Sequence, residues 1–195
     1  MTTLTISKFS RTVTAGQYDA LHGEVSPSST YEIPVPRALA SRHSSAFLDG
    51  CRLHELLQRM GDTGPLSAME KRYLPWMSAL RTKLRELGVK RIEAEQPLSR
   101  WNGIPGGVCD LRLHGGPTPE GVLELKVVSH LPETPLVKDL VQVGAYAALA
   151  DVRTYDRVWA GLAYASIKDA HIRLFLFSDV AALVGNASEL FANAA

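Results

Sequence analysis

Three runs of strand-forming residues near the middle of the chain limit the folds that this sequence can adopt. They span residues 90–98, 106–113 and 121–128, and turn-forming segments rich in Gly and Pro separate them. The second connection is short enough for an antiparallel pair. A helical pattern over 135–152 follows, and then strand-like runs at 157–167 and 171–177 and a short terminal helix. This order predicts an α/β domain with a mixed central β-sheet.

Two helices are expected before these strands. Residues 45–60 carry an apolar stripe at helical spacing, made of Leu53, Leu56, Leu57 and Met60. A second helix ends at Gly88 and carries Tyr73, Met77, Leu80, Leu84 and Leu87 on one side, and Pro75 should kink it or split it in two. Residues 1–45 are rich in Ser, Thr and Pro, so we expect an irregular N-terminal arm with one or two strands, followed by a single domain over 46–195.

Composition and charge exclude several classes of protein. The chain is 46% hydrophobic and 21% charged, without a membrane-spanning run or a secretory signal, which predicts a cytoplasmic protein with no membrane partner. A net charge of +1 argues against non-specific coating of DNA, but not against a cleft that holds a few phosphates. Cys51 and Cys109 are too few for a disulfide framework or a four-thiolate site, and we expect buried free thiols.

Two charged residues interrupt the most hydrophobic of the strands. In residues 121–128, Leu123, Leu125 and Val127 alternate with Glu124 and Lys126. Because side chains alternate across a strand, the apolar set should face the core while Glu124 and Lys126 project together from the opposite face. The strand therefore presents a carboxylate and an amine side by side.

A second carboxylate is expected close to Glu124. We place Asp110 at the end of the preceding strand, from where it can approach Glu124 across the antiparallel pair. Burying two unpaired carboxylates together is costly, and Mg²⁺ or Mn²⁺ would remove that cost because these ions take oxygen ligands. Lys126 could then hold a water or stabilise charge on a phosphoryl oxygen. The alternative is an exposed Glu124–Lys126 ion pair, with Asp110 as a turn residue.

Five short motifs, in order over residues 50 to 146, resemble those of the PD-(D/E)XK nuclease superfamily and, within it, the RecB-like nucleases. They are Gly50-x-x-x-His54, the acidic strand with Glu95 (better spaced than Glu93), Gly107-x-x-Asp110, Glu124-Leu125-Lys126 and Gln142-x-x-x-Tyr146. Gln142 and Tyr146 are four residues apart, on one ridge of the helix and away from its expected buried stripe of Leu136, Leu140, Val143 and Ala147.

The resemblance implies a restriction-endonuclease-like core and a metal-dependent deoxyribonuclease. It places Mg²⁺ or Mn²⁺ on His54, Asp110, Glu124 and the Leu125 carbonyl, and gives Lys126 the task of positioning or activating the attacking water. Gln142 and Tyr146 would orient the scissile strand or support Lys126, and Glu95 would be a further acidic residue of the site. Related nucleases with an iron–sulfur cluster carry four cysteines, so none is expected here.

The expected activity is phosphodiester hydrolysis in recombination, repair or phage DNA processing, with an exonuclease as the leading form. The partner is single- or double-stranded DNA, and a recombination protein or further copies of the chain are additional candidates. One alternative is a non-cleaving nucleic-acid-binding or assembly subunit built on the same fold. Another is a restriction-type endonuclease that uses the same hairpin, although the His54 and Gln142 motifs favour the RecB-like branch.

Overall fold

The computed structural model contains one mixed six-stranded β-sheet. It describes residues 6, 11–14, 17, 25–35, 46–58, 68–150, 157–166 and 168–193. In chain order the elements are β1 (Ser29–Pro34), α3 (Ala46–Gln58), α4 (Ala68–Glu86), β2 (Val89–Leu98), β3 (Gly107–Gly115), β4 (Glu120–Val127), α5 (Val137–Ala150), β5 (Val158–Ser166), β6 (His171–Phe177) and α6 (Ala181–Ala192). The predicted α/β class with a mixed central sheet is confirmed.

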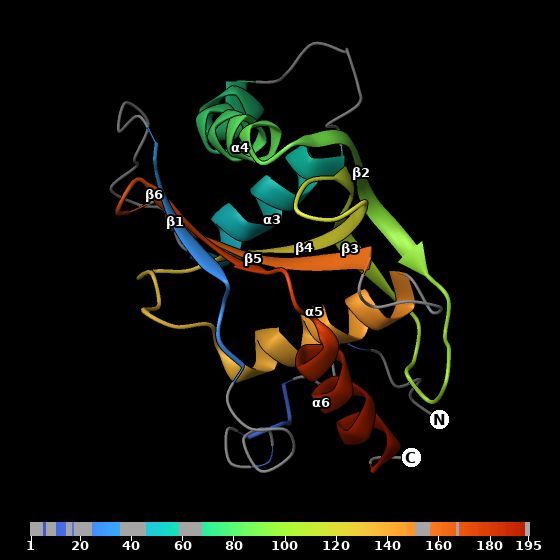
Figure 1. The fold of residues 1–195 in the computed structure, drawn as a ribbon. Helices are drawn as coiled ribbons and strands as arrows, with labels where there is room; N and C mark the ends of the chain where they lie inside the picture. The colour runs from blue at the N-terminus through green and yellow to red at the C-terminus, as the bar shows by residue number, and fades with distance from the viewer. Residues whose placement is uncertain are drawn as a thin grey trace.

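The strand order across the sheet is β1-β6-β5-β4-β3-β2. β4 and β5 pair in parallel, and the other neighbours pair antiparallel. α5 makes the crossover that a parallel pair needs, and it covers one face of the sheet while doing so (Figure 1). This topology puts β4 between β3 and β5, with α5 packed against it.

Helices cover both faces of the sheet, and each face has its own core. α5 and α6 pack on one face with the apolar residues of β5 and β6, such as Leu162 and Phe175. α3 and α4 pack on the other, against Leu123 and Leu125 of β4 (Figure 1). β4 and β5 are therefore buried from both sides, which explains why their sequences are so apolar.

Most of the elements expected from sequence are confirmed to within a few residues. The buried side of α4 is the expected one, apart from the partly buried Leu87 at its end. Leu53 and Leu56 of α3 are buried, whereas the side chains of Leu57 and Met60 lie outside the part of the chain that the structure describes. Among the described helices, none is long and apolar enough to cross a membrane.

Of the two outcomes expected at Pro75, a kink or a split, the split is absent, because α4 runs through Pro75 from Ala68 to Glu86 and its neighbour Trp76 is buried in the core. Two expectations about other residues are wrong. Leu136 precedes α5 and is 40% exposed rather than part of its buried stripe. Cys109 is buried as expected, but Cys51 is exposed.

The N-terminal segment contains a strand, as expected, and the structure places it at Ser29–Pro34. β1 lies within residues 1–45 and pairs antiparallel with β6 at the edge of the sheet, from Ser29↔Leu176 to Pro34↔His171. Ile6 is buried in the core beneath α5. The division into an arm and a domain at residue 46 stays a prediction.

Candidate active site

The sheet divides where the acidic residues of β3 and β4 meet. In the described part of the chain, β3 pairs with β4 only over Leu111–His114 and Glu120–Leu123. Before this stretch β3 pairs with β2 as far as Gly107, and after it β4 pairs with β5 as far as Val127. Residues 107–110 and 124–127 therefore border a fork in the sheet. Strands that separate in this way leave room for side chains between them.

Asp110 lies at the base of the fork, and its position corrects the sequence prediction. It is not the end of a strand, because β3 continues to Gly115; it marks the point where pairing with β4 stops. Its Oδ2 accepts a hydrogen bond of 2.7 Å from the backbone N–H of Leu125. The Asp110 carboxylate thus takes the place that a backbone carbonyl would have in a continuous ladder. This hydrogen bond fixes Asp110 beside Glu124, and the Asp110 side chain is only 6% exposed.

His54 and Glu95 complete a cluster around Asp110. The His54 Nδ1 atom lies 3.3 Å from Asp110 Oδ1 and 3.6 Å from Glu95 Oε1. Each residue of this group offers one ligand atom, and these atoms lie within 4.8 Å of one another. α3, β2 and β3 each supply one member, so distant parts of the sequence meet here. Two carboxylates and an imidazole at this spacing can hold a metal ion.

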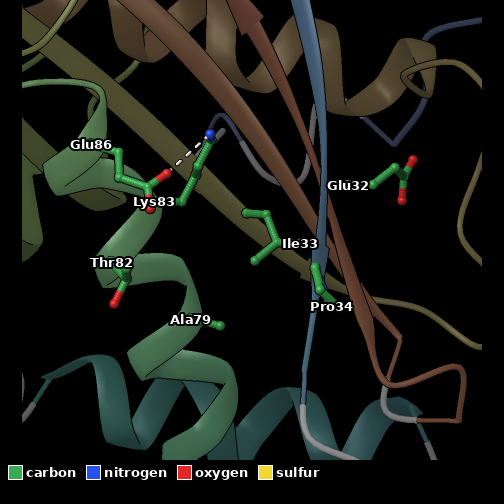
Figure 2. Close-up of a pocket in the computed structure, with 7 residues that line it drawn as sticks. All are labelled: Glu32, Ile33, Pro34, Ala79, Thr82, Lys83 and Glu86. Carbon is green, nitrogen blue, oxygen red and sulfur yellow. Dashed lines mark hydrogen bonds and ion pairs between the residues drawn. The ribbon is translucent and has the colours of Figure 1, made fainter.

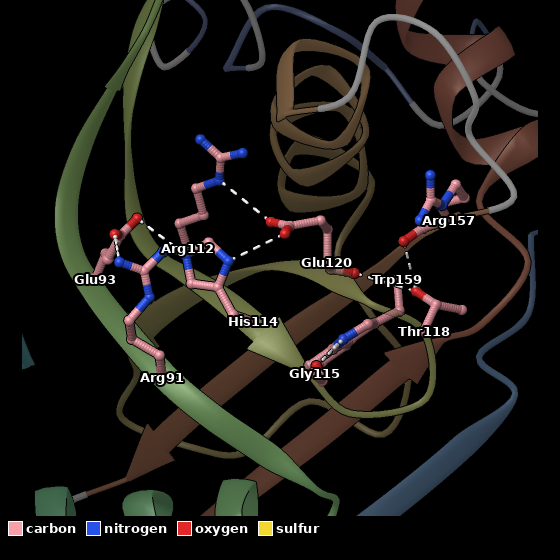
Figure 3. A network of polar contacts seen from close by, with 9 residues as sticks. All are labelled: Arg91, Glu93, Arg112, His114, Gly115, Thr118, Glu120, Arg157 and Trp159. Atoms are coloured by element: carbon pink, nitrogen blue, oxygen red, sulfur yellow. Dashed lines mark hydrogen bonds and ion pairs between the residues drawn. The ribbon is translucent and has the colours of Figure 1, made fainter.

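The register of β2 against β3 explains why Glu95, rather than Glu93, joins the cluster. Glu93 lies opposite Arg112, and the same register places Glu95 opposite Asp110, with a φ of 49° that is uncommon for a non-glycine residue. Glu93 is engaged elsewhere: its carboxylate contacts Arg91 at 2.8 Å and His114 Nε2 at 3.1 Å (Figure 3). That second network continues to Glu120 through His114 Nδ1 at 3.0 Å.

Glu124 is held by the two polar side chains that the sequence placed beside it. Its Oε1 accepts hydrogen bonds from Lys126 Nζ at 2.6 Å and from Gln142 Nε2 at 2.7 Å. Lys126 also donates to Gln142 Oε1 at 2.8 Å. The three side chains form a closed triangle that joins β4 to α5. The other carboxylate oxygen, Glu124 Oε2, is buried and has no hydrogen-bond partner among the described residues.

The electrostatics of the cluster follow from burial and from the two neighbouring carboxylates. Burial and the charge of Asp110 raise the pKa of Glu124 to about 8. The hydrogen bond to Asp110 raises the pKa of His54 to about 9, although burial opposes this. Burial also lowers the pKa of Lys126, but the charge and hydrogen bond of Glu124 outweigh it and the net shift is upward. Glu124 and His54 therefore hold protons that a bound cation could displace.

Tyr146 is buried on α5, one helical turn after Gln142. Its ring packs against Gly107, the glycine of the Gly107-x-x-Asp110 motif. Gln142 Nε2 lies 3.4 Å from the Tyr146 hydroxyl, to which it donates. A β-carbon added at Gly107 would lie 2.9 Å from Tyr146 Cε1, closer than real contacts allow. Gly50, in contrast, has room for a β-carbon, 3.6 Å from the nearest atom of Val127. The two motif glycines therefore have different roles.

Sequence reasoning missed two buried polar residues next to this site. The Tyr164 hydroxyl donates to Asp139 Oδ2 at 2.8 Å and accepts from the Leu136 N–H at 3.1 Å. Tyr164 is paired with Lys126 across β4 and β5, and Asp139 lies three residues before Gln142 on α5. The pair ties the start of α5 to the sheet. An Asp three residues before the Gln142 motif was a visible signal, but nothing in the sequence linked it to Tyr164.

A cavity of about 320 Å³ lies elsewhere, between β1 and α4. Its lining includes Glu32, Lys83 and Glu86, and Lys83 donates to Glu86 rather than pointing to a free acceptor (Figure 2). Lys83 Nζ also lies 4.2 Å from the centre of the Tyr31 ring. None of the residues that line this cavity belongs to the cluster around Asp110 and Glu124.

Comparison with known proteins gives similarity in structure only. No family model and no curated protein matches the chain. A crystal structure from Eubacterium rectale, named as a candidate exonuclease, aligns with a TM-score of 0.49 at 14% identity, over 77% of this chain and 65% of that one. The structure of a protein named SSO0001 aligns with a TM-score of 0.37 at 18% identity, over 72% and 70% of the two chains. Similarity at these levels does not bear on activity.

Proposed function

We propose that this chain is a metal-dependent nuclease of the RecB-like PD-(D/E)XK type, which hydrolyses phosphodiester bonds in DNA and acts as an exonuclease. The observation that carries the proposal is the cluster of His54, Glu95 and Asp110 at the fork in the sheet, with the Glu124–Lys126 ion pair on the neighbouring strand. Each of these residues comes from a motif that the sequence singled out for the same chemistry. The proposal covers substrate and reaction, neither of which the fold alone determines.

The residues present fit a hard divalent cation. Glu124 Oε2 is a buried oxygen to which no described residue donates, and burying such an atom is costly unless a partner is supplied. Asp110 and Glu95 add carboxylate oxygens and His54 adds one nitrogen, a set that suits Mg²⁺ or Mn²⁺. We propose that His54, Asp110, Glu124 and the Leu125 carbonyl hold the ion, with Glu95 close by. When bound, it would polarise a phosphoryl oxygen and lower the pKa of water.

The chain's own contribution centres on Lys126. An ammonium has three N–H donors, and two of them are directed to Glu124 and Gln142 among the described residues. The third can donate to a water or to a phosphoryl oxygen that gains charge during the reaction. Because the pKa of Lys126 is raised, the group keeps its proton at neutral pH. Lys126 therefore serves as a fixed cation that positions the water, rather than as a base.

Gln142 sets the direction of that ammonium. Its amide oxygen accepts from Lys126 while its amide nitrogen donates to Glu124 and Tyr146, so both ends of the side chain are committed. Rotation of Gln142 would break all of these contacts. The glutamine and the tyrosine behind it thus support the catalytic pair, and we propose that they do not contact the reacting phosphate in this arrangement.

Degradation of end-labelled linear DNA with Mg²⁺, compared with closed circular DNA, tests the proposal. Lys126→Ala should lower the rate about 100- to 1,000-fold, the usual cost of removing one preorganised donor. Lys83→Ala is the matched control, because Lys83 is also ion-paired to a glutamate but lies on α4 near the separate cavity. Cleavage by Lys126→Ala at the wild-type rate would refute the role of the lysine. Mn²⁺ binding without any turnover would favour the non-cleaving subunit instead.

A further inference from the structure

The connection between β2 and β3 ends in a tight two-residue turn. Ile104 N–H donates to Trp101 C=O at 2.9 Å, and Trp101 N–H donates to Ile104 C=O at 3.1 Å. The residues between them, Asn102 and Gly103, have φ values of 46° and 82°. Two central residues with positive φ are the mark of a type I′ turn, whose twist matches that of the strands it joins. The tip of this hairpin is therefore a defined structure.

Two further contacts fix the hairpin to the domain. Ile104 is 1% exposed and belongs to the same core as Tyr146. A β-carbon at Gly106 would lie 2.7 Å from the Leu98 carbonyl oxygen, so the two halves of the hairpin approach closely at its base. The exposed residues at the tip of the hairpin are therefore held at a constant position relative to the fork in the sheet.

The hairpin presents an apolar surface that continues from the acidic cluster. Of the four large hydrophobic side chains that are exposed among the described residues, Trp101 and Val108 lie here, at 38% and 46%. Val108 pairs with the exposed Pro97 across β2 and β3. Val108 lies two residues before Asp110, and Pro97 lies two residues after Glu95. Along the hairpin, the exposed apolar residues thus extend from positions next to the proposed metal ligands to Trp101 at the tip.

We propose that this hairpin is a nucleobase platform, on which Trp101 stacks against an unpaired base of the strand whose phosphate lies at Asp110. The inference rests on the proposed function, and it names the substrate class as DNA with unpaired bases, either single-stranded or with a single-stranded overhang. A rigid exposed aromatic ring suits any base, because every base has a π-face. The exposed Arg100 next to it supplies a cation for the backbone.

The distances along the chain agree with one continuous strand of substrate. Trp101 lies six positions after Glu95 in the chain, a span of at most about 20 Å in extended conformation. A base on Trp101 would therefore lie within a few nucleotides of the phosphate held at the cluster. In a duplex the bases are paired and stacked on one another, so stacking on Trp101 requires that the end of the duplex be opened.

Trp101 can serve as an intrinsic fluorescent probe for this contact. Trp76 is 1% exposed and Trp159 is 0% exposed, so Trp101 is the tryptophan that added DNA can reach. We would titrate the protein with a 12-nucleotide oligo(dT) in EDTA, which prevents cleavage, and follow tryptophan emission and its quenching by acrylamide. The oligonucleotide should quench Trp101 and protect it from acrylamide. A blunt duplex of the same length should do neither.

Variants separate stacking from other effects. Trp101→Ala should weaken oligo(dT) binding about 5- to 150-fold, the usual loss for one stacked base, and Trp101→Phe should recover most of it. Leu74→Ala removes an equally exposed apolar side chain on α4 and should leave the affinity unchanged. Unchanged binding by Trp101→Ala would overturn the platform and leave the surface to a protein partner. Equal quenching by the blunt duplex would also overturn it.

The outcome can be told apart from that of the proposed nuclease activity, because this titration needs neither metal nor turnover. A wild-type protein that cleaves DNA while its Trp101 variants bind oligo(dT) normally would refute the platform alone. A wild-type protein that binds and quenches but never cleaves would support the platform and refute the nuclease.

Discussion

Replacement of Gly107 and of Gly50 with alanine should have opposite effects on stability, although each glycine is simply the first residue of a short motif in the sequence. At Gly107 the new β-carbon would lie 2.9 Å from Tyr146 Cε1 and 3.3 Å from Ile6 Cδ1. Both neighbours are buried, at 3% and 0% exposure, so neither can move into solvent. Overpacking of this kind costs about 1–3 kcal/mol.

Gly50 provides the matched control. It lies inside α3, and its β-carbon would meet Val127 at 3.6 Å, an ordinary contact. Alanine is favoured over glycine in a helix by about 1 kcal/mol, so Gly50→Ala should stabilise the protein. For a chain of this length each kcal/mol shifts the Tm by about 2–4 °C, which predicts a fall of about 2–12 °C for Gly107→Ala and a rise of about 2–4 °C for Gly50→Ala.

Thermal unfolding followed by circular dichroism, on both variants at one pH and without divalent cation, measures the two shifts. The two shifts in Tm should differ in sign. If Gly107→Ala unfolds at the wild-type temperature, Tyr146 does not pack against β3 as described, and the explanation of the motif glycine fails. If Gly50→Ala is strongly destabilised, α3 approaches β4 more closely than the structure shows.

Two further predictions concern the buried polar groups. The pKa of Glu124 is raised to about 8, so the folded state holds this proton more tightly than the unfolded chain; without metal, the free energy of unfolding should therefore fall as the pH rises from about 5 to about 8. Urea titrations at several pH values measure this slope, and the same slope in Glu124→Gln would contradict the assignment. Tyr164→Phe leaves the Asp139 carboxylate and the Leu136 N–H without the hydroxyl between them and should cost about 1–3 kcal/mol. Tyr31→Phe, at a partly buried ring beside Lys83, is its control and should stay within about 0.5 kcal/mol of wild type, so equal losses in the two variants would refute the contact.

Local patterns in the sequence were sufficient to predict how the strand and the helix of the site orient their side chains. Alternation in residues 121–128 placed Glu124 and Lys126 on one face, and four-residue spacing placed Gln142 above Tyr146; the contacts between β4 and α5 follow from these two periodicities. Such patterns are local, because each depends on neighbours in one strand or one helix.

What the sequence did not show depends on contacts between distant segments. The pairing of β1 with β6 joins residues more than a hundred positions apart, and no turn or spacing marks it. The place of Asp110 in the sheet depends on where β4 leaves β3, and the choice of Glu95 over Glu93 depends on the register of β2 against β3. The link between Asp139 and Tyr164 likewise exists only after α5 packs on β5.

We infer that a divalent cation is held between the carboxylates of β3 and β4, with the Lys126 ammonium beside it. Crystals soaked in Mn²⁺ and measured by anomalous diffraction would reveal such an ion. We expect a manganese peak within coordinating distance of both Asp110 and Glu124, and its loss in Asp110→Asn crystals. No peak at the fork, or a peak that touches neither carboxylate, would refute a cation bound between these strands.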